Sequence, residues 1–341
     1  MAPVGTISPY LDAVRETLMS RSSFSFTPDR DLPAPPARRA DTGAGPRLIF
    51  VGFPSDYSLA FLLGLLRLDV RVCGIVTSPG AHPAILADNA LSRIADHLGV
   101  PLLRTWRIND EHSRIDITAL RPDAAVMASF NQIVHAPTLR IPRHGFMNVH
   151  PSLLPQLRGP EPVYWAIAEG APRSGITLHR AVPRVDAGPI LAQAEVRIDP
   201  LDTSGTLTRR LVGAGLPLLG EAVATLLAGT PGVQPDLKAG SYRPPVGHRR
   251  LDEAPSAAVA ERMVRAGVPN MPAWTVLKGR VAYILAARIR AGGAAGPDRA
   301  PHLSFPDGDL LLLSTSASCH CHHDVENCPH REEEAATPVQ L

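Results

Sequence analysis

The chain has 341 residues, which is enough for about two domains. Hydrophobic residues make up 45% and charged residues 19% of the chain, so the composition excludes an intrinsically disordered protein. The 34 Lys and Arg residues nearly balance the 32 Asp and Glu residues, and a formal net charge of +2 gives no sign of the basic surface that bulk nucleic-acid binding requires.

The sequence predicts neither a membrane span nor a secretion signal. No run reaches the roughly 18 apolar residues of a transmembrane helix. Asp12, Arg15 and Glu16 interrupt the N-terminal segment where a signal peptide is apolar. We therefore expect a cytoplasmic protein that does not bind membranes.

The predicted elements begin with an extension over 1–46, in which one short helix (10–21) precedes a linker rich in Pro, Arg and Gly. From Arg47 on, apolar runs typical of buried strands alternate with helical segments. Strands are predicted over 47–53, 70–78, 100–105, 124–129 and 145–152, and helices over 58–68 and 90–98. This alternation predicts an α/β fold with a Rossmann-like, mostly parallel sheet, whose ligands bind beyond the carboxyl ends of the strands.

The turn after the first predicted strand, Gly52 to Asp56, lacks the G-x-G-x-x-G pattern of dinucleotide-binding proteins. The chain also contains no Walker lysine motif. We therefore expect no nucleotide-phosphate cradle.

The residues beyond 230 predict a second, small β-rich domain. They contain a helix over 257–266, two strands around Lys278-Gly279 and a hairpin over 302–314. The predicted parts of the chain are an N-terminal extension (1–46), an α/β domain (47–230), a β-rich domain (231–314) and a tail (315–341).

The strongest local signal is N-V-H-P-S-L-L-P over 148–155. Asn148 and His150 are two residues apart on a predicted strand, so their side chains emerge on the same face. A carboxamide and a protonated imidazole together suit the stabilisation of a developing oxyanion.

A second signal is D-A-G over 186–188, between predicted strands at 174–182 and 189–198. A carboxylate at Asp186 could raise the pKa of His150, or order a water that carries a proton away. Taken singly, Asn148 and Asp186 are typical turn-forming or capping residues, and His150 is a typical core residue. The single residues therefore leave the function open.

Taken together, these segments resemble the formyltetrahydrofolate-dependent formyltransferase family. The resemblance rests on NVHPSLLPQLRGPEPVYWAIAEG (148–170), SGITLHRAVPRVDAGPILAQ (174–193), DTSGTLTRRL (202–211) and RLIFVGFPSDYSLAFL (47–62). Residues 261–289 resemble the C-terminal domain of methionyl-tRNA formyltransferase. The resemblance implies a formyltransferase fold followed by an OB-like C-terminal domain.

The resemblance places the family's catalytic residues on Asn148, His150 and Asp186. It implies 10-formyltetrahydrofolate as cosubstrate and an acceptor amine that attacks the formyl carbon. Asn148 and a protonated His150 would stabilise the tetrahedral oxyanion. Asp186 would support His150 and help a proton reach the leaving folate nitrogen.

The resemblance also implies a folate pocket built largely from backbone, with His179 as structural support. The implied pocket residues are Phe130, Asn131, Gln132, Val134, Ser152 and Val185. Arg158 and Gly159 follow the proline-bounded loop, where an acceptor would approach. Arg158 either holds a carboxylate or phosphate of the acceptor or is an ordinary solvated loop arginine.

Two departures bear on the acceptor. Residues 78–90 contain no Lys or Arg, where methionyl-tRNA formyltransferases resemble each other in a basic loop, and FNQIV (130–134) looks nearer to members that formylate small amines. We therefore expect a small metabolite amine, such as an amino sugar or a hydroxyornithine-type amine, as acceptor. Initiator tRNA is the less favoured partner. The alternatives are a methionyl-tRNA formyltransferase, a formyltetrahydrofolate hydrolase and a metal-handling or regulatory protein.

The tail places three Cys and four His within residues 319–330. At this density such ligands could hold zinc or Cu(I), with Cys319, Cys321, Cys328 and His330 as the candidate ligands. Their spacing is not that of a standard zinc site, so a flexible tail that binds metal adventitiously is the alternative.

Overall fold

The computed structural model describes residues 45–78, 87–247, 249–290 and 301–316. The chain forms two compact units that are not consecutive in sequence. The first unit comprises Met1–Gly159, Gly175–Val196 and Arg209–Tyr242, and the second comprises Pro160–Ser174, Arg197–Thr208 and Arg243–Leu341. The helix predicted over 10–21 and the Cys- and His-rich tail lie outside the described residues.

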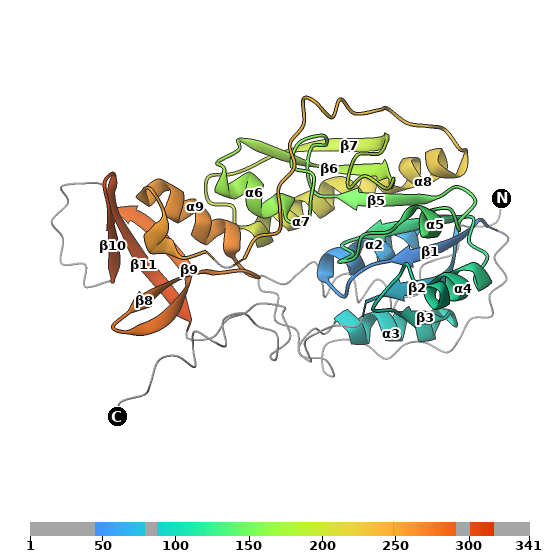
Figure 1. Ribbon diagram of the computed structural model, residues 1–341, viewed down its shortest axis with the longest axis horizontal. Helices are drawn as coiled ribbons and strands as arrows, with labels where there is room; N and C mark the ends of the chain where they lie inside the picture. The colour runs from blue at the N-terminus through green and yellow to red at the C-terminus, as the bar shows by residue number, and fades with distance from the viewer. Residues whose placement is uncertain (1–44, 79–86, 248, 291–300, 317–341) are drawn as a thin grey trace. The chain divides into compact units, whose positions relative to one another are not determined.

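A seven-stranded sheet forms the centre of the first unit, in the order β3-β2-β1-β4-β5-β6-β7 (Figure 1). Its strands are β1 (Arg47–Val51), β2 (Arg71–Thr77), β3 (Leu102–Arg104), β4 (Ala124–Ala128), β5 (Phe146–His150), β6 (Arg173–Arg180) and β7 (Ile190–Arg197). The first five strands pair in parallel, and β6 pairs antiparallel with β5. The predicted Rossmann-like, mostly parallel sheet is thus confirmed.

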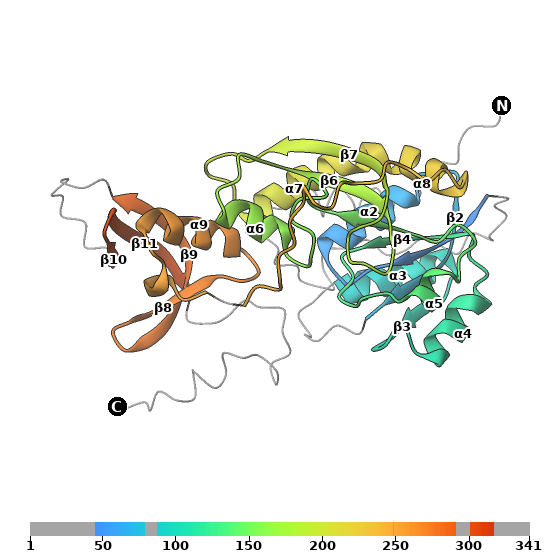
Figure 2. The ribbon, with the colours of Figure 1, turned by 45° about the horizontal axis from the view of Figure 1, so that its top comes forward.

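Helices cover both faces of this sheet (Figures 1 and 2). They are α2 (Asp56–Leu65), α3 (Ala87–Leu98), α4 (Glu111–Ala119), the short α5 (Ala136–Leu139), α7 (Ser204–Gly215) and α8 (Leu219–Leu227), the last two joined by the 3-10 turn η1 (Leu216–Leu218). Successive residues of β1 are buried on opposite faces, because apolar cover lies on both sides of the sheet. This explains why the strand appears in the sequence as a continuous apolar run.

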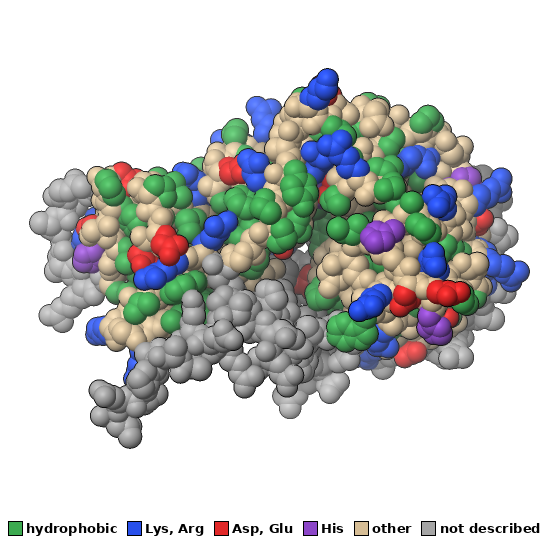
Figure 3. All heavy atoms as spheres, in the orientation of Figure 1, with side chains coloured by type: hydrophobic (Ala, Val, Ile, Leu, Met, Phe, Trp, Pro, Cys, Tyr) green, Lys and Arg blue, Asp and Glu red, His purple; other side chains and the backbone are tan. Residues whose placement is uncertain are grey.

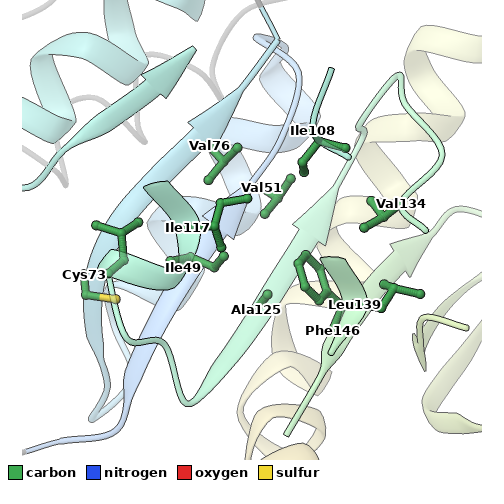
Figure 4. Packing of buried hydrophobic residues seen from close by; sticks show 11 residues of the cluster. Ile49, Val51, Cys73, Val76, Ile108, Ile117, Ala125, Val134, Leu139 and Phe146 are labelled. Carbon is green, nitrogen blue, oxygen red and sulfur yellow. The ribbon is translucent and has the colours of Figure 1, made fainter. Parts of the chain in front are cut away.

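One part of the core lies between the sheet and helices α4 and α5 (Figure 4). Ile49 and Val51 of β1 and Phe146 of β5 pack there with Ile117 of α4 and Leu139 of α5. Cys73 of β2 belongs to the same cluster and is a free thiol, as expected for a buried small side chain.

The helical run Ser204–Leu227 is, by length and composition, apolar enough to cross a membrane, with a mean hydropathy of 1.4. This differs from the expectation that no run would qualify. Leu211, Leu219 and Leu226 of this run are buried within the protein. Core helices of soluble proteins pass the same test, so the run is a weak indication of a membrane span.

The second unit contains a four-stranded antiparallel sheet, in the order β10-β11-β9-β8. Its strands are β8 (Ala273–Leu277), β9 (Arg280–Arg290), β10 (His302–Phe305) and β11 (Gly308–Ser316), and its helices are α6 (Pro162–Ala168), the 3-10 turn η2 (Leu251–Glu253) and α9 (Ala257–Gly267). Lys278 and Gly279 both have positive φ values, +52° and +76°, as a two-residue hairpin turn requires. A small antiparallel β domain at the C-terminal end of the chain is thus confirmed.

Candidate active site

The catalytic candidates meet at the carboxyl end of β5. Asn148 and His150 occupy this strand end, and the register of the β5–β6 pair places His179 of β6 opposite Asn148. The hydroxyl of Tyr57, at the start of α2, donates to the carbonyl oxygen of Val149, between the two candidates, across 3.2 Å. This half-buried tyrosine therefore supports the backbone from which the side chains of Asn148 and His150 project.

Asp186 reaches this strand end from the loop between β6 and β7. Its φ of +47° lies in the left-handed region, where a short polar side chain is tolerated best. A Cβ atom at Gly188 would lie 1.8 Å from the carbonyl oxygen of Arg180. Glycine is therefore required there, because it lets the loop pack closely against β6.

The Asp186 carboxylate connects four groups. Its Oδ1 atom accepts a hydrogen bond from Nδ2 of Asn148 (3.2 Å) and lies 3.5 Å from Nε2 of His179. Its Oδ2 atom accepts from the backbone N–H of Gly159 (2.9 Å) and lies 3.6 Å from Nδ1 of His150. The structure thus brings together the three predicted catalytic residues and Gly159.

Hydrogen-bond chemistry fixes the orientation of these side chains. The carboxylate can only accept, so the Asn148 carboxamide must turn its NH₂ group toward Asp186. His150 lies 3.0 Å by Nε2 from the carbonyl oxygen of Leu157, which requires a proton on Nε2. His179 lies 3.0 Å by Nδ1 from the Arg180 carbonyl oxygen, so Nδ1 carries a proton and Nε2 faces Asn148 at 3.3 Å.

Burial and charge shift the pKa values of the His150–Asp186 pair. Burial alone would raise the pKa of Asp186, but His150, His179 and the Gly159 N–H together hold it well below its usual range. Burial lowers the pKa of His150, and the opposing effect of Asp186 does not restore it. Asp186 does raise the pKa of His150, as expected, but desolvation of the enclosed imidazole is the larger effect, so the pKa stays below its ordinary value.

The loop that follows β5 supplies hydrogen-bond partners to the side chains of His150 and Asp186. This loop is held by residues 239–242, which we call the strap. The Oγ atom of Ser241 accepts a hydrogen bond from the N–H of Leu157 (2.9 Å), and the Ser241 carbonyl oxygen accepts one from the N–H of Arg158 (3.0 Å). The N–H of Ser241 in turn donates to the carbonyl of Pro155 (3.1 Å). The strap therefore holds Leu157, the partner of His150, and Arg158, which directly precedes Gly159, the partner of Asp186.

The predicted folate-pocket residues are placed beyond β4 and in the two loops. The Gln132 side chain bonds the backbone of Thr105 and Ile108, and Val134 is buried in the core of the first unit. Asn131 accepts a hydrogen bond from Ser78 at the end of β2. The side chains of Asn131 and Gln132 thus join the segments that follow β2, β3 and β4.

The remaining pocket candidates divide between packing and the loops. Phe130 packs against the core, and Ser152 donates its hydroxyl to the Gln156 carbonyl (2.7 Å) within the loop after β5. Val185 is half-buried directly before Asp186. Arg158 is buried rather than solvated.

Two supporting residues, Tyr57 and Ser241, were not expected from the sequence. Both act through backbone atoms of distant segments, and no local pattern marks such contacts. Among the described residues, no group of three or more His, Cys, Asp or Glu side chains is arranged to hold a metal ion. The candidate ligands Cys319, Cys321, Cys328 and His330 lie outside these residues.

The comparison with known proteins fits this geometry. The sequence model of a family described as "Formyl transferase" matches residues 82–223. The methionyl-tRNA formyltransferase of Bacillus licheniformis is 35% identical over 249 residues, which are 71% of this chain and 78% of that protein. The chain belongs to the formyltransferase family.

Solved structures with the same fold include other formyltransferases. A sugar N-formyltransferase from Shewanella sp FDAARGOS_354 superimposes with a TM-score of 0.55 at 21% identity, over 70% of this chain and 96% of that one. HypX from Aquifex aeolicus, solved in complex with tetrahydrofolic acid, gives a TM-score of 0.54 at 16% identity, over 79% of this chain and 44% of HypX. These likenesses establish the formyltransferase fold.

Proposed function

We propose that this formyltransferase moves a formyl group from 10-formyltetrahydrofolate to an acceptor amine, with Asn148, His150 and Asp186 as its catalytic residues. The observation that carries the proposal is the Asp186 carboxylate, which contacts Asn148, His150 and the Gly159 N–H at one strand end. A donor amide, a base and an ionised carboxylate are the groups that acyl transfer to an amine requires.

In the first step, the amine nitrogen bonds to the formyl carbon and the carbonyl electron pair moves to oxygen. Asn148 donates from its NH₂ group to this oxyanion, and its orientation is already fixed by Asp186. The proton that the amine loses passes to His150, which is neutral near pH 7 because burial lowers its pKa. Asp186, 3.6 Å from Nδ1, then stabilises the imidazolium.

In the second step, the oxyanion collapses and the bond between the formyl carbon and N10 breaks. His150 returns its proton to N10, so the products are the N-formylated amine and tetrahydrofolate. No proton or electron pair is left over, and His150 ends in its starting state.

For the acceptor we favour a small metabolite amine. The absence of Lys and Arg in 78–90 supports this, because phosphate contacts dominate affinity for tRNA. On the face shown in Figure 3, Lys and Arg side chains lie singly among hydrophobic and acidic ones rather than in one basic patch. Initiator methionyl-tRNA is the second candidate, because the 35% identical relative is named a methionyl-tRNA formyltransferase.

The test is the release of tetrahydrofolate from 10-formyltetrahydrofolate, with methionyl-tRNA or a panel of small amines as acceptors. Release that requires a small amine supports the proposal in full, and release that requires methionyl-tRNA supports the second candidate. Release without any amine indicates a hydrolase. If no tetrahydrofolate is released under any of these conditions, the proposed chemistry is contradicted.

A further inference from the structure

Arg158 carries a buried positive charge without a counterion in the described part of the chain. Only 8% of the residue is exposed, and its Nε atom is buried without a hydrogen-bond partner. A guanidinium stays protonated at any physiological pH. Burying an ionised group costs free energy unless it is paired, so such a side chain is typical of a site that a ligand completes.

The backbone places this side chain beside the catalytic contacts. The N–H of Arg158 donates to the Ser241 carbonyl (3.0 Å), so the root of the side chain is fixed by the strap. The preceding residue, Leu157, is the partner of His150, and the following residue, Gly159, is the partner of Asp186. The Arg158 side chain therefore starts from backbone that lies between a partner of His150 and a partner of Asp186.

The charges around the site favour an anionic ligand. Among the described residues, Asp186 is the one carboxylate in contact with Asn148, His150, His179 and Gly159, and both of its oxygens have partners there. The planar guanidinium presents several N–H donors in a fork that matches two oxygens of a carboxylate or phosphate. We propose that Arg158 binds an anionic oxygen group, a carboxylate or a phosphate, of one of the two substrates.

This inference rests on the proposed function only for the identity of the substrates. The binding test itself needs no turnover and uses inorganic phosphate as the probe. The melting temperature of the full-length protein is measured with increasing phosphate, against chloride at matched ionic strength. The variants are Arg158→Gln, Arg158→Lys and, as matched control, Arg140→Gln at an exposed arginine of the first unit.

We expect phosphate to raise the melting temperature of the wild type and of Arg140→Gln, by mass action on the folded state. Arg158→Gln should show no such rise, and Arg158→Lys a smaller one. Without phosphate, Arg158→Gln should melt no lower than the wild type, because it removes an unpaired buried charge. An equal phosphate effect in Arg158→Gln, or none in the wild type, would overturn the proposal. If Arg158→Gln does not fold, Arg158→Lys replaces it in this test. A phosphate-induced rise in melting temperature equal to that of the wild type would then overturn the proposal.

Steady-state kinetics then identify the substrate that carries the anion. Matched amine pairs, glucosamine 6-phosphate with glucosamine and methionine with its methyl ester, isolate the contribution of the anionic group. If the anionic group belongs to the acceptor, Arg158→Gln raises the KM of the anionic amine about tenfold or more and leaves the KM of its uncharged counterpart unchanged. If it belongs to the donor, KM rises for 10-formyltetrahydrofolate instead, and a change in neither KM overturns the proposal. Phosphate binding without any formyl transfer would refute the proposed function but not this site.

Discussion

Gly159 donates its backbone N–H to the Oδ2 atom of Asp186 across 2.9 Å. This bond joins the loop after β5 to the loop between β6 and β7, which are separated by 27 residues in the sequence. Asn148 binds the other oxygen of the same carboxylate. Asp186 therefore holds both the Asn148 carboxamide, which we propose is catalytic, and the loop after β5.

Asp186→Asn should lower the rate of formyl transfer by about 100- to 1,000-fold. The substituted amide has nearly the same size, but its NH₂ group cannot accept from Asn148 or Gly159, and it cannot stabilise a protonated His150. The measurement is kcat for tetrahydrofolate release. The exposed Asp116→Asn on α4 is the control and should keep full activity; a fully active Asp186→Asn enzyme would contradict the assigned role.

The pH dependence of kcat/KM distinguishes two roles for His150. Because burial lowers its pKa, a neutral base should make kcat/KM rise with pH through a value below 6.5 and then level off. His150→Gln should remove this rise and lower kcat by about 100-fold or more. An activity that instead falls as pH increases through 6–8 would show that the protonated imidazole is the active form.

Gly188→Ala should destabilise the fold and the active site together. The added methyl group would meet the Arg180 carbonyl oxygen at 1.8 Å, so the loop that carries Asp186 must shift. We expect a cost of about 1–3 kcal/mol and a loss of turnover. The measurements are thermal unfolding and folate release.

Gly213→Ala is the matched control for this change. Gly213 lies on α7 with open space around its Cβ position. Alanine there should leave activity unchanged and stabilise the protein by about 0.5–1 kcal/mol. Equal effects of the two substitutions would contradict the close-approach argument.

Glu161 should make the protein less stable at alkaline pH. Burial raises the pKa of this carboxyl from 4.5 to about 7, and no partner for it is present among the described residues. Its folded-state pKa lies above its unfolded value, so stability is complete at pH 4 and is lost as pH rises through about 7. The cost of ionising it in the folded state is about 3 kcal/mol.

Glu161→Gln should therefore raise the melting temperature at pH 8 and leave it nearly unchanged at pH 4. Denaturant unfolding at the two pH values measures the difference in free energy. The exposed Glu253→Gln should change stability at neither pH. A Glu161→Gln effect of the same size at both pH values would exclude titration of this carboxyl as the cause.

Strands β1, β2, β4 and β5 could be predicted within a few residues because they are buried on both faces. The α4 helix could not: only Ser113 and Ile117 of its residues are buried, so its apolar periodicity is weak. The Lys278-Gly279 turn was predictable because glycine tolerates the positive φ that Gly279 adopts, +76°. Helices, strands and turns could thus be predicted where burial or turn chemistry leaves a local pattern in the sequence.

The candidate catalytic side chains could be named from a family resemblance, but their electrostatics could not be predicted from it. The pKa of His150 depends on how completely the folded chain encloses the ring, and no motif states this. Likewise, nothing near Arg158 in sequence indicates that its Nε atom is buried without a hydrogen-bond partner. Such properties arise from segments that meet only in the folded protein.

The strap limits how this protein can be divided and recombined. Ser241 holds Leu157 and Arg158 in place, although it lies 84 residues beyond Leu157. A fragment that ends near residue 230 would lack Ser241, and so would lose the hydrogen bonds that hold the loop after β5. Chimeras with the C-terminal portions of other formyltransferases should be joined after Tyr242, because this junction keeps the strap in the same chain as the loop that it holds.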